Sequence, residues 1–239
     1  MSLFEKKDIK YEMKLLSSLE KVFPDETPVY RMECQLLSGL WGETVSFQVA
    51  YMGDYFMRER LDVRVVSELA EHVHVRTVEM VPVGRATNGI VDDNYLKTTS
   101  GLYPDLLKDL KDGKVIVYSR QWRSLWVDVD ITNEIPAGEY EIELQLIKEG
   151  EVVCSAKQKV TVIGTELPKL DIMHTEWMHA DCLADYYHVE PFGERHWNVL
   201  EGQIRLAGEL GINMLLAPVF TPPLDTRVGG ERTTVQLVD

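Results

Sequence analysis

The chain has 239 residues, of which 45% are hydrophobic and 27% are charged, and its formal net charge is −14. This length can bury the core of one or two domains, whereas the acidic balance excludes nucleic acid and anionic membranes as natural partners, because both attract basic proteins. No apolar run approaches the ~20 residues that cross a bilayer. The N-terminus has no apolar core of signal-peptide length, so we expect a cytoplasmic protein.

The N-terminal segment and the cysteines give limited information. Ile9, Met13 and Leu16 have helical spacing, but residues 11–15 also alternate as a strand does, so both structures stay open for residues 6–19. The cysteines are scattered and form no CxxC pair, which predicts free thiols. Cys34 and Cys154 are expected to be buried in strands.

Residues 28–163 show the alternation of apolar and polar residues that is typical of half-buried strands. In Glu139–Leu146 every second residue is apolar, and the turn Lys148-Glu149-Gly150 predicts a hairpin with Glu151–Ile163. The remaining strands are expected at Val29–Leu37, Thr44–Tyr51, Leu61–Val66, Val73–Val81, Lys114–Tyr118 and Trp126–Ile131. Many short strands separated by turns predict an immunoglobulin-like β-sandwich over residues 1–166.

One insertion and several large side chains complete the expected sandwich. Residues 92–112 interrupt the strand pattern, and Leu106–Leu110 has the spacing of a short helix. Trp41, Trp122 and Trp126 are expected in the sandwich core. His72 and His74 have the spacing of metal ligands but are expected to share one face of a strand inside the sandwich, so we assign them no metal.

A second unit is predicted over residues 167–239, after a boundary near Gly164–Lys169. Leu170–Trp177 reads as a strand followed by a long loop, and Glu194–Leu210 reads as an amphipathic helix. Gly211 is placed to end that helix. Ile212–Phe220 is almost entirely apolar, as in a strand buried on both faces of a parallel sheet. Strand, helix and strand in this order predict a parallel crossover, which both doubly wound sheets and (β/α)8 barrels contain.

The loops after the two strands favour a barrel site. They contain no glycine-rich phosphate-binding motif and are rich in aromatic and polar side chains. In barrels the active site lies at the carboxyl ends of the strands. Aromatic rings beside carboxylates and imidazoles suit a sugar, because rings stack on its apolar face and carboxylates accept from its hydroxyls. The candidate substrate-binding residues are Trp177, His179, Asp181, Tyr186, Thr221, Asp225 and Arg232.

Two long segments resemble a known family. The run TEWMHADCLADYYHVEPFGERHW, followed by GINMLLAPVFTPPLDTRVGGERTTVQLVD, resembles the start of the catalytic barrel of glycoside hydrolase family 123 and its relatives (domain of unknown function 4091). The upstream segments GETVSFQVAY, GLYPDLL and LWVDVDI…PAGEYEIEL are similar to the β-sandwich of that family. The expected fold is therefore mainly β, an immunoglobulin-like sandwich followed by a truncated (β/α)8 barrel start.

The resemblance implies hydrolysis of β-linked N-acetylhexosamine glycans, typically N-acetylgalactosaminides. It implies a substrate-assisted mechanism, in which the acetamido carbonyl of the sugar attacks the anomeric carbon and an Asp-Glu pair orients it and supplies the acid. The only such dipeptide here is Asp25-Glu26, which lies between two prolines and reads as a turn. We therefore expect no catalytic residue and no cofactor in this chain, and an inactive N-terminal fragment of a glycosidase.

Other interpretations stay open. Trp177, Tyr186 and Tyr187 also fit plain packing under a loop. The pairs His174/Glu176 and His179/Asp181 could bind a metal, although a barrel metallohydrolase more typically has His-x-His on its first strand. The chain could instead be a non-catalytic carbohydrate-binding or structural module. An exposed apolar strand edge would favour self-association or pairing with remaining barrel segments.

Overall fold

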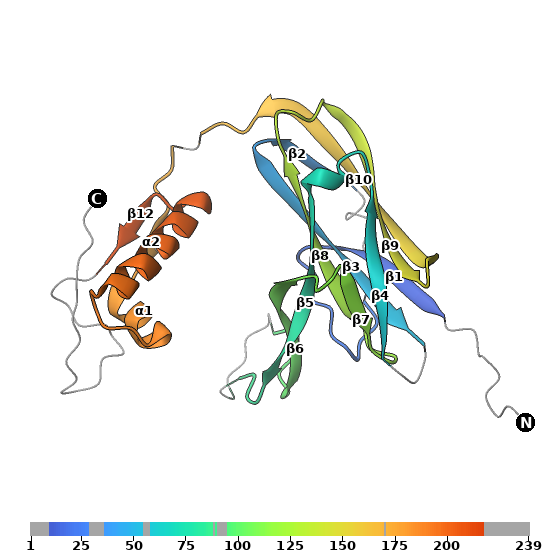
Figure 1. The fold of residues 1–239 in the computed structure, drawn as a ribbon, viewed down its shortest axis with the longest axis horizontal. Coiled ribbons are helices and arrows are strands. Elements are labelled where there is room, and N and C mark those ends of the chain that lie inside the picture. Colours follow the sequence, from blue (N-terminus) through green and yellow to red (C-terminus); the bar gives the residue numbers. More distant parts are fainter. Residues whose placement is uncertain are drawn as a thin grey trace, which may run out of the picture. The chain divides into compact units, whose positions relative to one another are not determined.

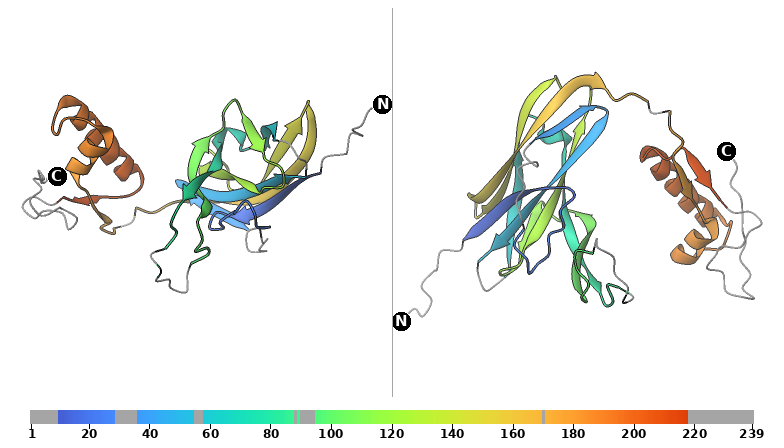
Figure 2. Two further views of the ribbon diagram at one scale, coloured as in Figure 1. Left: turned by 90° about the horizontal axis from the view of Figure 1, so that it is seen from below. Right: turned by 180° about the vertical axis from the view of Figure 1, so that it is seen from behind.

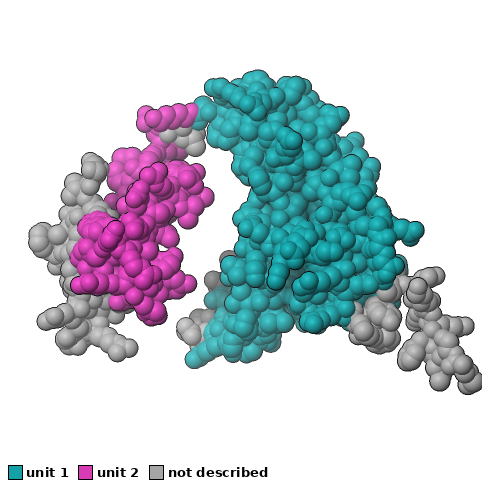
Figure 3. All heavy atoms as spheres, in the orientation of Figure 1, with its two compact units in different colours: residues 1–168 teal, residues 169–239 magenta. Residues whose placement is uncertain are grey.

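The computed structural model describes residues 10–28, 36–54, 58–87, 89, 95–169 and 171–217, and for Asp181 the backbone only. The chain divides into two compact units, residues 1–168 and 169–239 (Figure 3). In unit 1 the elements are β1 (Tyr11–Ser17), β2 (Leu37–Trp41), β3 (Glu43–Gly53), β4 (Glu59–Val66), η2 (Ala70–His72), β5 (Val73–Val83), β6 (Gly101–Asp109), β7 (Lys114–Val117), β8 (Arg123–Ile131), β9 (Gly138–Lys148) and β10 (Glu151–Glu166). In unit 2 they are β11 (Thr175–Trp177), α1 (Ala180–Tyr187), α2 (Glu194–Glu209) and β12 (Met214–Leu216) (Figure 1).

Unit 1 consists of two curved β-sheets that enclose one core (Figure 2). The strand orders among the described residues are β1-β3-β8-β5-β6 and β2-β10-β9-β4-β7. The pairings are antiparallel except that β2 lies parallel to β10. The predicted hairpin is β9–β10, and Glu149 and Gly150 both have positive φ in its turn. The mainly-β fold predicted from the sequence is confirmed.

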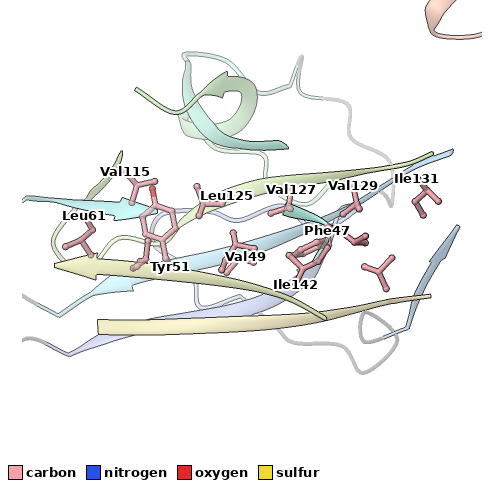
Figure 4. Close-up of a cluster of buried hydrophobic side chains, with 14 of the residues drawn as sticks. Phe47, Val49, Tyr51, Leu61, Val115, Leu125, Val127, Val129, Ile131 and Ile142 are labelled. Carbon is pink, nitrogen blue, oxygen red and sulfur yellow. The ribbon is translucent and has the colours of Figure 1, made fainter. Parts of the chain in front are cut away.

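The core lies between the inner faces of the two sheets (Figure 4). Phe47, Val49 and Leu125 come from one sheet, and Ile142 and Leu144 come from the other. The alternation in β9 is confirmed, because Ile142, Leu144 and Leu146 are fully buried. Removing such alternating apolar faces from water is the main stabilising contribution to the sandwich.

A strap that follows β1, residues 18–28, covers part of the outer face of the first sheet. Its Val22 packs with Leu16, Ala50 and Trp122 in a second buried cluster. The side-chain amide of the buried Gln48 donates to the carbonyl oxygens of Ser17, Ser18 and Glu20 at 3.3, 3.1 and 2.8 Å. The strap is therefore held by hydrogen bonds as well as by apolar packing.

Two expectations for the backbone of unit 1 are decided by sheet pairing. Residues 11–17 form β1, which pairs with β3, so the strand alternative is correct. The helix expected at Leu106–Leu110 is wrong, because residues 101–109 form the edge strand β6. Edge pairing with β5 supplies the hydrogen bonds, and Pro104 lies at a register shift opposite Glu79/Met80, where its missing N–H is tolerated.

Three side-chain expectations in unit 1 also change. Trp126 lies half-buried on the outer face, where its Nε1 donates to Asp128 Oδ1 at 2.7 Å, whereas its neighbours Leu125 and Val127 face the core. Trp122 is buried, but in the second cluster beneath the strap. His72 and His74 do not share a strand face inside the sandwich. His72 belongs to the turn η2, and His74 is an exposed partner of Asp130 at 3.0 Å.

Unit 2 is a strand–helix–helix–strand unit in which β11 and β12 are parallel neighbours. The helix expected over 194–210 is confirmed as α2, and Gly211 follows it with φ of 81°. The long loop expected after the first strand contains the helix α1, which the sequence analysis missed. Among the described residues, no helix is long and apolar enough to cross a membrane.

The burial of unit 2 also differs from expectation. The sequence places Trp197, Leu200, Ile204 and Leu210 on the apolar face of the expected helix. Leu200 is buried, but the other three are substantially exposed. The strand expected at Ile212–Phe220 is described as the shorter β12, and residues 218–220 lie outside the described part. Met214 and Leu216 are each 42% exposed rather than buried.

Candidate functional site

The candidate site lies at the carboxyl ends of β11 and β12. Thr175, Glu176 and Trp177 pair in parallel with Met214, Leu215 and Leu216. The pairing continues one residue further, since the backbone N–H of Met178 donates to the Leu216 carbonyl at 3.0 Å. Side chains that follow either strand therefore emerge at the same edge of the small sheet.

Asn213 fixes the opposite, entry end of this strand pair. Its Oδ1 accepts from the backbone N–H of His174 at 2.9 Å, and its Nδ2 donates to the Ile172 carbonyl at 2.8 Å. The amide side chain thus imitates a neighbouring strand, with one donor and one acceptor. Asn213 was missed by the sequence analysis, and its only signal was a polar residue at the start of an apolar run.

Trp177 and His179 form the described aromatic part of the site. Their rings are nearly parallel, with an interplanar angle of 13° and centroids 6.5 Å apart. Trp177 is 68% exposed, so an apolar surface of the indole is open to solvent. The Nδ1 of His179 is buried and has no hydrogen-bond partner among the described residues. Together they present a flat apolar surface beside an unused polar nitrogen.

Tyr186 and Tyr187 lie at the other end of α1. Their rings meet edge to face, with centroids 5.0 Å apart and an interplanar angle of 83°. Tyr186 is 78% exposed, so it does not pack under a loop. His188 ends the helix in a left-handed conformation, with φ of 51°. The helix α1 therefore separates the tyrosine pair from the Trp177/His179 pair along the chain.

His196 is the structural centre of this unit and was not identified from the sequence. It is completely buried, and its Nδ1 accepts from the backbone N–H of Phe192 at 2.8 Å. Its Nε2 lies 2.7 Å from the Ala180 carbonyl oxygen. Because Nδ1 accepts, the proton must be on Nε2, which donates to Ala180. One imidazole thus ties the start of α2 to the start of α1, and the Phe192–His196 spacing of four was the only sequence signal.

The predicted site residues have different outcomes. The structure brings Trp177 and His179 together and places Tyr186 on the same helix–strand unit. For Asp181 it gives only a backbone position in the first turn of α1, and Thr221, Asp225 and Arg232 lie outside the described residues. His174 Nε2 and Glu176 Oε1 are 3.2 Å apart, but within the described ranges no three His, Cys, Asp or Glu side chains form a group that could hold a metal ion.

Part of unit 2 matches a known family model. Residues 177–239 match the family model described as glycoside hydrolase 123, catalytic domain. The structure is also similar to a family 123 glycoside hydrolase from Clostridium perfringens, solved to study glycolipid glycan hydrolysis, with a TM-score of 0.66 and 12% identity. That similarity covers 88% of this chain and 38% of the other, so the chain spans well under half of that hydrolase.

Other similarities are weaker. The N-terminal domain of PorA has a TM-score of 0.31 at 10% identity, over 64% of this chain and 99% of that domain. A β-glucosidase from Listeria innocua has a TM-score of 0.31 at 11% identity, over 69% of this chain and 18% of the enzyme. No curated protein matches the chain.

Residues 177–239 therefore match the catalytic domain of glycoside hydrolase family 123, which is the family that the sequence resembles. The structural similarity shows that the chain shares the fold of part of a family 123 hydrolase.

Proposed function

We propose that this chain supplies an immunoglobulin-like β-sandwich and the first strand–helix–strand part of a (β/α)8 barrel in a glycoside hydrolase. The observation that carries the proposal is the parallel β11–β12 pair, whose carboxyl ends lie within the segment that matches the family 123 catalytic domain. Parallel strands joined through helices are the repeating unit of such barrels.

The proposed substrate is a glycan with a β-linked N-acetylhexosamine, of which N-acetylgalactosamine is the first candidate. The exposed indole of Trp177 would stack on the apolar face of the sugar ring, and the neighbouring imidazole of His179 would bond a hydroxyl or the acetamido group. Carboxylate and guanidinium groups at Asp181, Asp225 and Arg232 would complete the polar contacts. These residues bind and orient the substrate, and none is assigned to proton transfer.

Asp25 and Glu26 do not form a general acid that could protonate a leaving group. These two carboxylates both bind Lys97 Nζ, at 3.0 and 3.1 Å, and the pair lies in the strap of unit 1. The hydrogen bond from Lys97 lowers the pKa of Asp25, which makes this carboxyl a poor proton donor at neutral pH. We therefore propose that the 239-residue chain alone does not hydrolyse glycosides.

Binding and hydrolysis test the two parts of this proposal separately. Titration with N-acetylgalactosamine, followed by NMR, should show binding that Trp177→Ala weakens roughly twofold to tenfold, the range expected for one aromatic contact. Trp197→Ala, on the exposed side of α2, is the matched control and should bind as the parent does. Equal losses in both variants, or no binding at all, would contradict the sugar site.

Hydrolysis is measured with the p-nitrophenyl β-N-acetylgalactosaminide. We expect no release of p-nitrophenol above the buffer rate, because the proposed role of this chain is to bind the sugar and not to cleave it. Clear release would show that the chain hydrolyses glycosides by itself, while leaving the sugar-binding result intact.

A non-catalytic carbohydrate-binding function is the second candidate, favoured by a groove of about 460 Å³ at one end of the sandwich. It is lined by Trp41, Glu43, Asp130, Asn133 and Glu166, among others. An indole beside carboxylates and an amide has the composition of a sugar site. If Asn133→Ala abolishes binding of N-acetylgalactosamine and Trp177→Ala does not, this second function replaces the first.

A further inference from the structure

A small pocket opens at the end of the sandwich where the chain passes from β6 in one sheet to β7 in the other. Its volume is about 180 Å³. Tyr51, Val78 and Val115 form its inner wall and are buried in or beside the core. Figure 4 shows Tyr51 next to Val115 and Leu61 at one end of that core. The pocket is therefore part of the rigid sandwich and belongs to unit 1 alone.

The charge of this pocket is opposite to that of the chain. Five cationic side chains line it against two carboxylates, in a protein whose net charge is −14. The cations are Arg60, Lys108, Lys111, Lys114 and Arg123, and the carboxylates are Glu79 and Asp109. Like charges gathered around a concave surface raise the local potential and attract an ion of the opposite sign.

Most of these cations are not neutralised within the described residues. Lys114 pairs with Asp62 at 2.9 Å, and Glu79 accepts from the Thr77 hydroxyl at 2.8 Å. For Arg60, Lys108 and Lys111 there is no ion pair with a described carboxylate. The excess positive charge therefore remains available to a ligand.

Arg123 provides the most specific feature of the pocket. Its Nη2 donates to Gln121 Oε1 at 3.0 Å, and its guanidinium lies 4.7 Å from the centre of the Tyr118 ring. Its Nε is buried and donates to no atom of the described residues. Buried donors are rarely left without an acceptor, so an acceptor supplied by a ligand or by water is expected here.

The phenol of Tyr51 adds a neutral donor to the inner wall. Burial raises the pKa of Tyr51 well above its usual range, and the nearby Arg123 opposes that rise only partly. The hydroxyl makes one long contact, 3.4 Å to the Ile116 carbonyl. The pocket volume of about 180 Å³ has room for one small oxyanion with a few waters.

We propose that this pocket binds one tetrahedral oxyanion, a sulfate or phosphate group, with Arg123 as its main ligand and Lys108 and Lys111 completing the positive wall. The planar guanidinium matches two oxygens of such a group, and bonds between charged partners are the strong class of hydrogen bond. The group is either a free ion or a substituent on a sugar. This inference does not rest on the proposed glycosidase function.

Calorimetric titration of the full chain with sodium sulfate and sodium phosphate, against sodium chloride at constant ionic strength, tests the proposal. Constant ionic strength keeps screening equal, so a heat of binding beyond chloride reports a specific site. Galactose 6-sulfate and galactose then distinguish the source. Tighter binding of the sulfated sugar than of sulfate indicates a glycan substituent, and equal or weaker binding indicates the free ion.

Arg123→Gln should weaken sulfate binding by about tenfold or more, because it removes the positively charged guanidinium group that would bond two oxygens of the ion. Since Arg123 also packs on Tyr118, the exposed double variant Lys108→Gln/Lys111→Gln is the second test if Arg123→Gln does not fold, and it should weaken binding several-fold. Arg64→Gln, an exposed cation of β4 outside the pocket, should leave binding unchanged. No excess heat over chloride, or an equal loss in Arg64→Gln, would overturn the proposal.

Discussion

His196 Nε2 donates to the carbonyl oxygen of Ala180 over 2.7 Å, and the imidazole that makes this contact is completely buried. Its other nitrogen accepts from the Phe192 backbone. Because Ala180 begins α1 and His196 lies in the first turn of α2, a single side chain sets the position of the helix that separates Trp177/His179 from Tyr186.

His196→Ala should destabilise unit 2 by about 2–4 kcal/mol, because it leaves two buried backbone groups without partners and creates a cavity. Arg195→Ala, at the exposed neighbouring position of α2, should change stability by less than about 0.5 kcal/mol. Hydrogen exchange of the α1 amides measures the effect. Unchanged protection in His196→Ala would show that the imidazole does not hold α1.

Gly39→Ala should destabilise the sandwich by about 1–3 kcal/mol, the range for overpacking a core. A Cβ at this β2 position would lie 2.6 Å from Ile131 Cδ1 and 2.8 Å from Val45 Cγ1, both too close. Gly101→Ala is the matched control in β6, because nothing lies within 4 Å of its added Cβ. Urea unfolding should separate the two variants, and equal midpoints would contradict the close packing of Gly39.

The decrease in unfolding free energy at acidic pH should depend on Glu59. Its partial burial raises the pKa of this carboxyl, but hydrogen bonds from Lys148, at 2.6 Å, and from Tyr11 outweigh burial and lower it overall. Because the pKa of Glu59 is lower in the folded protein than its ordinary value of 4.5, the ionised carboxylate stabilises the fold above pH 4.5. This stabilisation is lost as the pH falls through the pKa of the folded protein. Glu59→Gln should therefore flatten the loss of unfolding free energy below about pH 4.5. Glu139→Gln, an exposed carboxylate of β9, serves as the control, and identical decreases at acidic pH would refute the linkage.

The two described cysteines should react at different rates. Burial raises the pKa of the Cys154 thiol to about 11, so at pH 8 only about one molecule in a thousand carries the reactive thiolate there. Cys182 is exposed on α1. Iodoacetamide at pH 8 should label Cys182 well before Cys154, as measured by peptide mass spectrometry. Faster labelling of Cys154 would mean that β10 opens readily.

The sequence determined those elements whose local pattern agrees with their tertiary surroundings. The alternation of residues 139–146 defined β9, and the glycine at 211 marked the end of α2. The apolar run Ile212–Phe220 contains β12, although the described strand is only Met214–Leu216. Trp177 and His179 belong to the sugar site that the sequence predicts, and the structure places their rings side by side. These features depend on backbone geometry within a few residues, which the local sequence specifies directly.

Tertiary structure alone decided the elements whose hydrogen bonds come from distant residues. Residues 106–110 have helical spacing, yet β5 offers them an open edge, and pairing there satisfies more backbone groups than one short helical turn could. The contact of His196 with Ala180 and the cationic pocket around Arg123 unite residues far apart in the sequence. Such contacts arise only after the sheets and helices have packed, because packing removes water and leaves each buried polar group to find a partner within the protein.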